Sequence, residues 1–283
     1  MAAVTPGAKI VELTTGVYAR LHEGLTNAGI IVGDDGVLVI DSLRVPSFAR
    51  DLIADVKHLS DKPITHVIDT HSHWDHSWGN EEFPDSTIIG HENCRAEMLD
   101  LEKLDAWRDK VVSSNEGWSE EAKTVQVTPP NLTFETSMQL YFGGRRIDLR
   151  YLGRAHTGGD IFIHLPDDRL LFTGDVAQDG GIPFMMDGYI QDWVGTDARL
   201  LELDCERFMA GHGPIGERPA IAEAAQFINA LAAGTKQAIA ESQDEATAAA
   251  GVTEALSERF GSWRGFERVE ESVAFAFREI SNS

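Results

Sequence analysis

A histidine-rich segment at residues 71–80, His-Ser-His-Trp-Asp-His-Ser-Trp-Gly-Asn, constrains this chain more than any other stretch. It follows a run of apolar and β-branched residues, 64–69, which predicts a buried strand. His71 and His73 are two positions apart, a turn of about 200° on a helix, so only a strand end or a tight loop can aim both at one point. The carboxylate and third imidazole of the segment can then face a second point beside the first. Because neutral imidazole and carboxylate suit zinc, iron or manganese, the segment predicts a metal site.

Three further motifs follow in order along the chain. His156 lies in Gly-Arg-Ala-His-Thr-Gly-Gly-Asp, Asp175 ends Leu-Phe-Thr-Gly-Asp, and His212 lies in Ala-Gly-His-Gly-Pro. With His-x-His-x-Asp-His after a strand, the four motifs together resemble the metallo-β-lactamase superfamily. The resemblance covers about residues 8–215.

The resemblance implies an α/β fold, a four-layer αββα sandwich with the metals at one edge between the sheets. On this interpretation residues 1–215 form the catalytic domain. Residues 216–283, which read as amphipathic helices, form a helical extension that packs on the sandwich or provides a dimer surface.

The resemblance also implies a set of metal ligands. It assigns one metal to His71, His73 and His156, a second to Asp75, His76 and His212, and a bridging position to Asp175. Two Zn²⁺ ions are expected, with iron or manganese as alternatives. The metals lower the pKa of a bridging water toward about 7, so that hydroxide attacks a carbonyl. Asp75 is the expected catalytic residue, because it can orient the hydroxide and pass on a proton.

These features predict a dinuclear metal-dependent hydrolase of a small ester, lactone, thioester or amide. Asp175 stands where some metallo-β-lactamases have cysteine, which disfavours a dedicated β-lactamase, and the pattern looks like glyoxalase II and lactonases. The C-terminal segment is acidic overall, with scattered Lys236, Arg264 and Arg268, and lacks the basic character of the glutathione-binding region of glyoxalase II, which weakens the thioesterase interpretation. Two alternatives stay open: an iron-dependent persulfide dioxygenase-like redox enzyme on the same fold, and a non-catalytic binding protein that kept the scaffold.

Two segments beside the motifs are candidate substrate-binding elements. The loop at residues 176–194 carries large apolar groups, and we expect Phe184 and Tyr189 to line a pocket, although packing on the loop's own core is equally compatible. For Trp74 the same two roles, lining a pocket and packing in the core, stay open. The polar stretch at residues 113–130 is expected to be a surface insertion or lid.

The apolar pattern predicts two hairpins and several helices. The hairpins join residues 28–32 to 37–41 and 161–165 to 170–172, each around an Asp-Asp turn, and suggest a weak internal repeat. Helical spacing of apolar residues predicts helices at 46–59, 94–112, 192–203 and through much of the chain after Arg218.

Composition narrows the partners to a small-molecule substrate and a possible homodimer. The formal net charge of −22 argues against binding to nucleic acid or to an anionic membrane. The two cysteines, Cys94 and Cys205, are expected to be buried free thiols in a reducing compartment. No secretion signal is evident in residues 1–7 and no run reaches the ~18 apolar residues of a membrane span, so we expect a cytoplasmic protein.

Overall fold

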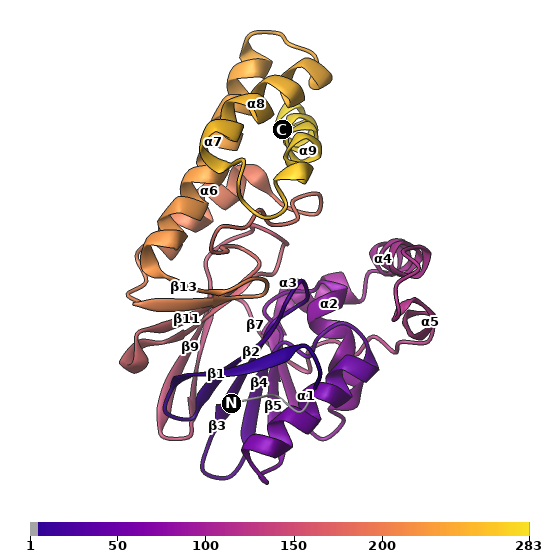
Figure 1. Cartoon of the computed structure of the whole chain (residues 1–283), viewed down its shortest axis with the longest axis vertical. Coiled ribbons are helices and arrows are strands. Elements are labelled where there is room, and N and C mark those ends of the chain that lie inside the picture. Colours follow the sequence, from indigo (N-terminus) through magenta and orange to yellow (C-terminus); the bar gives the residue numbers. More distant parts are fainter. Residues whose placement is uncertain (1–4, 283) are drawn as a thin grey trace.

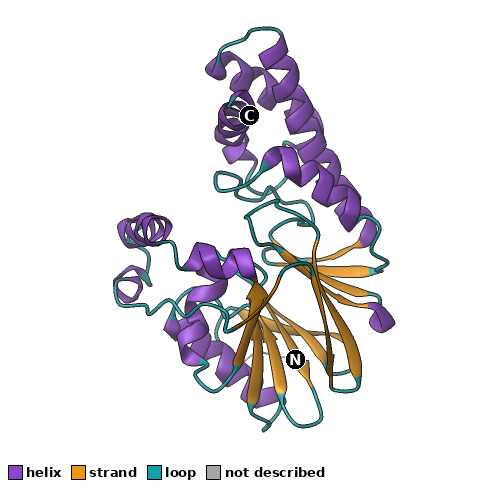
Figure 2. Cartoon of the chain, turned by 180° about the vertical axis from the view of Figure 1, so that it is seen from behind, coloured by secondary structure: helices purple, strands orange, loops and turns teal. Residues whose placement is uncertain are grey.

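Two β-sheets packed face to face form the centre of the computed structural model, which describes residues 5–282 (Figures 1 and 2). The first sheet has seven strands in the order β1-β2-β3-β4-β5-β6-β7. Pairing is antiparallel from β1 to β4 and parallel from β4 to β7. The strand bounds are β1 Ala8–Thr14, β2 Val17–His22, β3 Ala28–Val32, β4 Val37–Ile40, β5 Ile64–Ile68, β6 Thr87–His91 and β7 Leu132–Phe134.

The second sheet has six strands in the order β13-β12-β11-β10-β9-β8. All neighbours pair antiparallel except β11 and β12, which are parallel. The strand bounds are β8 Ser137–Phe142, β9 Arg145–Tyr151, β10 Ile161–Leu165, β11 Leu170–Gly174, β12 Arg207–Ala210 and β13 Ile215–Glu217. Both predicted hairpins are present, as β3–β4 and β10–β11.

Several strands are continuously apolar, and this allows each sheet to be covered on both of its faces. Successive side chains of a strand point to opposite faces, so Ile31 faces the second sheet while Ile30 faces the helix on the outer side. In the second sheet, Ile163 faces the inter-sheet core and Phe162 faces the outer helices. The sheets therefore share one core and each has a second core beneath its helices.

The outer layers are helices, which confirms the predicted αββα sandwich. Helix α1, Pro46–Leu59, covers the first sheet and buries Leu52 and Val56 against it. Helix α6, Ile190–Leu200, covers the second sheet with Trp193 in its core. The metal motifs connect strand ends at one edge of the sandwich.

Three helices after β13 form a C-terminal arm, shown in orange and yellow in Figure 1. They are α7 Arg218–Ala240, α8 Glu245–Phe260 and α9 Val269–Ser281, with the short 3₁₀ helix η3, Phe266–Arg268, before α9. The arm shares the apolar core of α6, with Phe227, Leu231 and Val273 in the cluster. No helix among residues 5–282 is long and apolar enough to cross a membrane.

The prediction of one helix over residues 94–112 is wrong. The structure has α3 at Glu92–Met98 and α4 at Leu101–Ser113. Asp100 separates them because its side chain accepts hydrogen bonds from the backbone N–H groups of Glu102 and Lys103, which starts a new helix. The short helix α5, Ser119–Ala122, follows within the predicted insertion.

Two further expectations concern the cysteines and the N-terminal stretch. Cys94 and Cys205 are both buried and free, as expected. The expectation for the N-terminal stretch concerns residues 1–7, of which 1–4 lie outside the described part.

Candidate metal centre

The histidine-rich segment changes from extended backbone to helix within a few residues. His73 has φ −62° and ψ 146°, and the short helix α2, Trp74–Ser77, begins directly after it. His71 lies in a bend and His73 on extended backbone before the helix, whereas α2 carries Asp75 and His76. Ser42 fixes this turn, since its backbone N–H donates to the carbonyl oxygen of His76 at 2.8 Å. The segment can therefore present two pairs of ligand groups in two directions.

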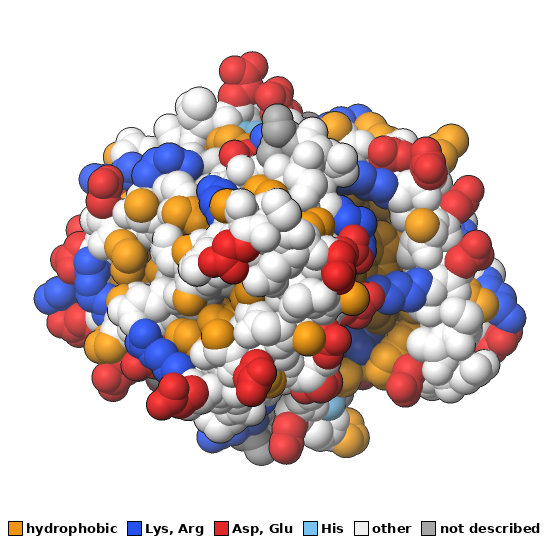
Figure 3. Space-filling model, turned by 90° about the horizontal axis from the view of Figure 1, so that it is seen from above, with side chains coloured by type: hydrophobic (Ala, Val, Ile, Leu, Met, Phe, Trp, Pro, Cys, Tyr) orange, Lys and Arg blue, Asp and Glu red, His pale blue; other side chains and the backbone are white. Residues whose placement is uncertain are grey.

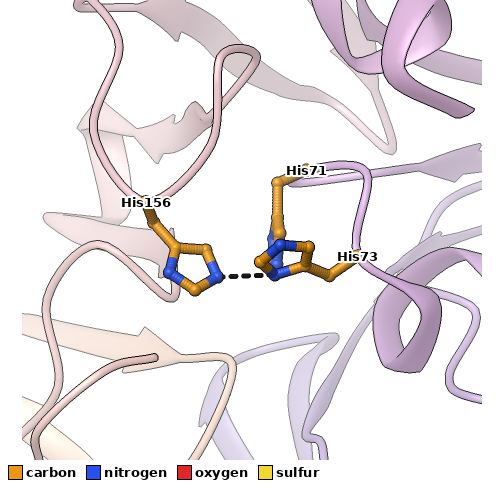
Figure 4. A group of neighbouring side chains, drawn as sticks. All are labelled: His71, His73 and His156. Carbon is orange, nitrogen blue, oxygen red and sulfur yellow. Dashed lines mark hydrogen bonds between the residues drawn. The ribbon is translucent and has the colours of Figure 1, made fainter. Parts of the chain in front are cut away.

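Three imidazoles form the first group of candidate ligands. His71, His73 and His156 each offer a nitrogen, and these three atoms lie within 4.8 Å of one another. His156 comes from the loop between β9 and β10 and faces the other two across the space between the sheets (Figure 4). Its Nε2 lies 2.8 Å from Nδ1 of His73. All three side chains are buried.

The second group combines carboxylates and imidazoles. The ligand atoms of Asp75, His76 and His212 also lie within 4.8 Å of one another, and the same holds for those of His71, His76 and Asp175. Nε2 of His212 lies 3.2 Å from Oδ2 of Asp75 and 3.3 Å from Oδ2 of Asp175. The same Asp175 oxygen lies 3.6 Å from Nε2 of His156. Asp175 thus stands between the two groups.

The five histidines share one arrangement of their two ring nitrogens. In each, one nitrogen faces the other ligands, and the opposite nitrogen contacts an acceptor. The acceptor is a carboxylate for His73 (Asp187, 3.2 Å) and His76 (Asp41, 2.8 Å), and the hydroxyl of Thr70 for His71 (3.0 Å). It is a backbone carbonyl oxygen for His156 (Phe184, 2.7 Å) and His212 (Leu25, 3.2 Å). An outer N–H bonded to an acceptor leaves a lone pair on the inner nitrogen. In their neutral forms, all five rings would therefore present a lone pair to the place where the two carboxylates also meet.

This convergence fits a metal centre, because two of its inner atoms have no hydrogen-bond partner among the described residues. The inner Nε2 of His71 and the Oδ1 of Asp175 are buried and lack a hydrogen-bond partner there. Lone pairs that face one another repel unless a proton or a cation lies between them. The donor set of imidazole nitrogens and carboxylate oxygens is the one that zinc and related divalent metals prefer.

Local electrostatics shift the pKa values of the ligand groups in different directions. Burial, with His73 beside it, lowers the pKa of His156 to about 3, so this ring is neutral at pH 7. Burial would raise the pKa of Asp75, but His76 and His212 outweigh it and hold that pKa well below its usual range. Burial lowers the pKa of His212, but Asp175 and Asp75 outweigh it and raise the value to about 10. The carboxylates therefore hold positive charge here, which a bound cation would supply in place of protons.

Asp41 is the supporting carboxylate of His76. It follows β4 with φ +61°, a backbone conformation that L-residues adopt rarely. One carboxylate oxygen accepts from the backbone N–H of Thr70 at 2.8 Å, and the other accepts from Thr70 Oγ1 and from Nδ1 of His76 at 2.9 and 2.8 Å. The strained turn thus fixes the orientation of the His76 ring.

Other carboxylates near the motifs have different roles. Asp160 accepts from the backbone N–H and the hydroxyl of Thr157 at 2.8 and 2.9 Å, which closes its own turn. Asp69 accepts from Asn80 at 2.8 Å. Neither makes a hydrogen bond to a histidine among the described residues.

Sequence reasoning did not identify Asp187. Its carboxylate accepts from His73 Nε2 at 3.2 Å and from the indole N–H of Trp107 on α4 at 2.9 Å. No motif marks this position. The apolar loop in which it lies was the only signal in the sequence, and it pointed to substrate contacts instead.

A buried arginine next to Asp75 was also missed. Arg44 is 5% exposed and donates to Thr26 Oγ1 at 3.3 Å, and Thr26 donates to Oδ2 of Asp75 at 2.8 Å. The guanidinium carbon lies 4.6 Å from the ring centre of Trp118 and 5.4 Å from that of Trp74. Trp118 of the insertion thus covers Arg44, and Glu121 of the same insertion accepts from the backbone N–H of Ser47 at 2.8 Å. The insertion is attached to the start of α1 beside the second ligand group.

Two cavities flank the ligand groups. A small cavity of about 30 Å³ lies beside His73. Its lining combines apolar side chains, those of Trp74, Trp78, Met98, Leu104, Trp107 and Val127, with polar ones that include Glu97, Lys103 and Asp187. A groove of about 790 Å³ opens beside Asp175 and His212. Seen from the arm end, the surface is hollowed between the body and the side that carries α4 and α5, with Lys and Arg side chains at the rim (Figure 3).

The three predicted substrate-binding residues lie in different places. Phe184 lines the groove, and its ring lies 6.0 Å from His73 and 5.5 Å from Trp107. Trp74 lines the small cavity and also packs on Arg44 and Trp78. Tyr189 lines neither cavity, and its ring packs against Arg154 at 4.3 Å.

A family model described as the metallo-beta-lactamase superfamily matches residues 22–212. A human acyl-coenzyme A thioesterase, MBLAC2, is 29% identical over 218 residues, which cover 69% of this chain and 76% of that protein. The metallo-beta-lactamase type 2 of Bacillus cereus is 22% identical over 202 residues, covering 69% and 70% of the two chains. The alpha subunit of a 2,4-dinitroanisole O-demethylase from Nocardioides sp. (strain JS1661) is 26% identical over 208 residues, and this match covers 72% of the present chain and 55% of that protein.

Solved structures show the same fold. A metallo-beta-lactamase from Pontibacter korlensis superposes with a TM-score of 0.64 and 16% identity, over 78% of this chain and 99% of that chain. The sec-alkylsulfatase Pisa1 from Pseudomonas sp. superposes with a TM-score of 0.77 and 19% identity, over 96% of this chain and 50% of that chain. The second likeness is broad enough to include most of the C-terminal arm.

Proposed function

The chain belongs to the metallo-beta-lactamase superfamily and is a metal-dependent hydrolase, and we propose that it uses two zinc ions to cleave a small ester, lactone, thioester or amide. One observation carries the proposal: five histidines turn one ring nitrogen inward, where two carboxylates join them, and hold the other nitrogen against an acceptor. Seven donors exceed what one tetrahedral zinc ion needs, and they divide into two groups.

The proposed ligand assignment follows the two groups. His71, His73 and His156 would hold one metal, Asp75, His76 and His212 would hold the other, and Asp175 would contact both. When bound, such metals supply Lewis acidity, which activates a water molecule near neutral pH and polarises a substrate carbonyl.

Asp75 is the proposed catalytic residue of the chain. Its side chain is 15% exposed, whereas that of His76 is fully buried, so its carboxylate can exchange a proton with the substrate space. Thr26 orients one of its oxygens through a 2.8 Å hydrogen bond, and Arg44 holds Thr26. This geometry lets Asp75 accept a proton from the attacking water and return it to the leaving group.

A carbonyl substrate agrees with the activities named for relatives. MBLAC2 is an acyl-coenzyme A thioesterase, and the Bacillus cereus relative is a metallo-beta-lactamase, so both act on acyl compounds. Phe184 and Trp107, in contact over His73, would shield the bound acyl group from water.

The test is hydrolysis of a panel of short esters, lactones, thioesters and amides by protein with a measured zinc content. We expect turnover of at least one class, its loss after chelation, and its return when zinc is restored. Asp175→Asn should lower zinc content and turnover together. Undiminished zinc and turnover in that variant would contradict the proposed ligand set.

Three wider features belong to the same proposal. We propose that residues 1–215 act as the catalytic domain and that the arm, residues 216–283, is an extension packed on it through the core around Leu231. A cytoplasmic location is supported by the two buried free thiols. A homodimer through the arm, and the absence of a nucleic-acid partner given the charge of −22, remain part of the proposal.

A further inference from the structure

Several distant parts of the chain contribute to the groove beside His212. We call it the arm groove; its lining includes Lys9 on β1, the turn after β2, the loop around Ile182, and residues 264–268 between α8 and α9. The C-terminal arm thus reaches back to the proposed metal site.

Backbone pairing fixes the arm segment in this position. The N–H of Arg264 donates to the carbonyl oxygen of Gly180 at 3.0 Å, and the N–H of Ile182 donates to the carbonyl oxygen of Arg264 at 2.8 Å. A Cβ atom placed on Gly213 would lie 2.3 Å from Nη2 of Arg264. The guanidinium of Arg264 therefore lies against the residue that follows His212.

Three cations of the arm groove have no acidic partner. Lys9, Arg264 and Arg268 form no ion pair within 4.0 Å among residues 5–282, although the chain carries a net charge of −22. Nη2 of Arg264 and Nη2 of Arg268 donate only to backbone carbonyl oxygens, those of Asp179 and Ile182, at 2.7 and 2.9 Å. Their charges are positioned but not neutralised.

Acidic side chains also line the arm groove, and they do not cancel these cations. Glu23 and Glu267 are the acidic lining residues other than Asp175, which the metal site uses. Three cations against two carboxylates leave the rim positive, and a bound anion meets guanidinium groups with free N–H donors.

The small cavity on the other side of the ligands has the opposite character. Its charged side chains have partners: Lys103 lies 3.5 Å from Glu97, and Asp187 accepts from His73 at 3.2 Å and from the indole N–H of Trp107 at 2.9 Å. Its free volume of about 30 Å³ admits a few atoms only, against about 790 Å³ for the arm groove. The two sides of a scissile bond at the metals would therefore face a short pocket that contains tryptophan, methionine and leucine side chains, and a large groove with a cationic rim.

We infer that the substrate is a short-chain acyl ester or thioester of a bulky, anionic alcohol or thiol, whose negative group binds in the arm groove against Lys9, Arg264 and Arg268. This inference rests on the proposed function. Water adds to the acyl carbon, the acyl carbon–sulfur or carbon–oxygen bond breaks, and the products are a carboxylic acid and the free anionic thiol or alcohol.

The test compares two thioesters that differ in charge but share the acyl group and the atoms around the sulfur: acetyl-coenzyme A and S-acetyl-N-acetylcysteamine. We expect the zinc-loaded wild-type protein to have the higher kcat/KM for the charged thioester, with a preference that shrinks as salt is added. Lys9→Gln, Arg264→Gln and Arg268→Gln should each reduce the ratio of the two kcat/KM values by about 1.5- to 5-fold, as befits exposed charges. The double arginine variant should reduce it further.

Two further variants separate charge from structure. Lys236→Gln, an exposed change on α7 away from the groove, should leave both kcat/KM values unchanged. Arg264→Lys should recover part of the ratio, because it restores the charge without the fork of donors.

The outcomes distinguish the inference from the function on which it rests. Equal kcat/KM for both thioesters in the wild type, or an equal loss for both in the arginine variants, would refute the proposed anion site. The arginines would then only hold the arm segment in place. Hydrolysis of neither thioester, nor of any ester, by zinc-loaded protein would instead refute the proposed hydrolase.

Discussion

The orientation of His76 should depend on one buried carboxylate, that of Asp41. The side chain of Asp41 is 3% exposed and accepts from the backbone N–H of Thr70, from the hydroxyl of Thr70 and from Nδ1 of His76. An asparagine tolerates the positive φ of 61° at this position, so Asp41→Asn changes the contacts and leaves the backbone intact.

The amide cannot satisfy all three contacts. The Thr70 N–H only donates, so the amide oxygen must stay with it, and the amide NH₂ then faces Nδ1 of His76. His76 must in response move its proton to Nε2, the atom that faces the other ligands. The flipped amide would instead leave the buried Thr70 N–H opposite a donor, which costs about 1–3 kcal/mol. Metal binding needs the lone pair on Nε2, so it selects the flipped amide and bears this cost. We therefore expect the second metal to bind about 5- to 150-fold more weakly.

Asp160→Asn is a matched control. Counted over the whole residue, Asp160 and Asp41 are both 2% exposed. Asp160 also accepts hydrogen bonds from a threonine N–H and hydroxyl, but it makes none to a histidine within the described part of the chain. Zinc titration against a chromophoric chelator measures both binding steps in each variant. We expect Asp41→Asn to weaken the second step and Asp160→Asn to leave both steps as in the wild type.

Two results would refute this reasoning. The first is tight binding of both metals by Asp41→Asn. The second is an equal loss of the second metal in Asp160→Asn, because the effect would then come from disturbing any buried carboxylate near the site.

Three other substitutions test separate parts of the structure. Asp187→Ala removes the partially exposed acceptor of His73 and should weaken zinc binding by about tenfold in the same titration, with unchanged binding as the contrary result. Phe184→Ala keeps the carbonyl oxygen that holds His156, so the ranking of substrates should change while zinc content stays; a loss of zinc would argue against a pocket role. Arg146 holds the pKa of Asp148 at about 2, below its value in the unfolded chain, so this carboxylate stabilises the fold above about pH 4 and ceases to do so as the pH falls toward 2. Asp148→Asn should flatten the fall in unfolding free energy across that window in urea titrations, and an unchanged slope would contradict this cause.

Sequence reasoning identified the residues whose chemistry is encoded locally. The spacing of His71 and His73 excludes a shared helix face, and the structure places both in the connection between β5 and α2, outside any helix. The hairpins around residues 33–36 and 166–169 followed from paired apolar runs, and both are present.

Contacts made only by the tertiary fold could not be read in this way. Asp187 and Thr26 reach the ligands from loops far away in the chain, and nothing in their local sequence marks them. Tyr189 shares an apolar loop with Phe184, but the helix that starts after Tyr189 turns its ring toward Arg154. The break between α3 and α4 was visible in principle, since Asp100 is a favourable N-cap, but the apolar spacing on both sides concealed it.

The most direct test of the central claim is the identity and number of metal ions per chain, measured by elemental mass spectrometry on protein purified without added metal. Two ligand groups joined by Asp175 predict about two zinc ions per chain. One iron ion per chain, with the second group empty, would contradict the dinuclear hydrolase and favour an oxygen-dependent redox enzyme on the same fold.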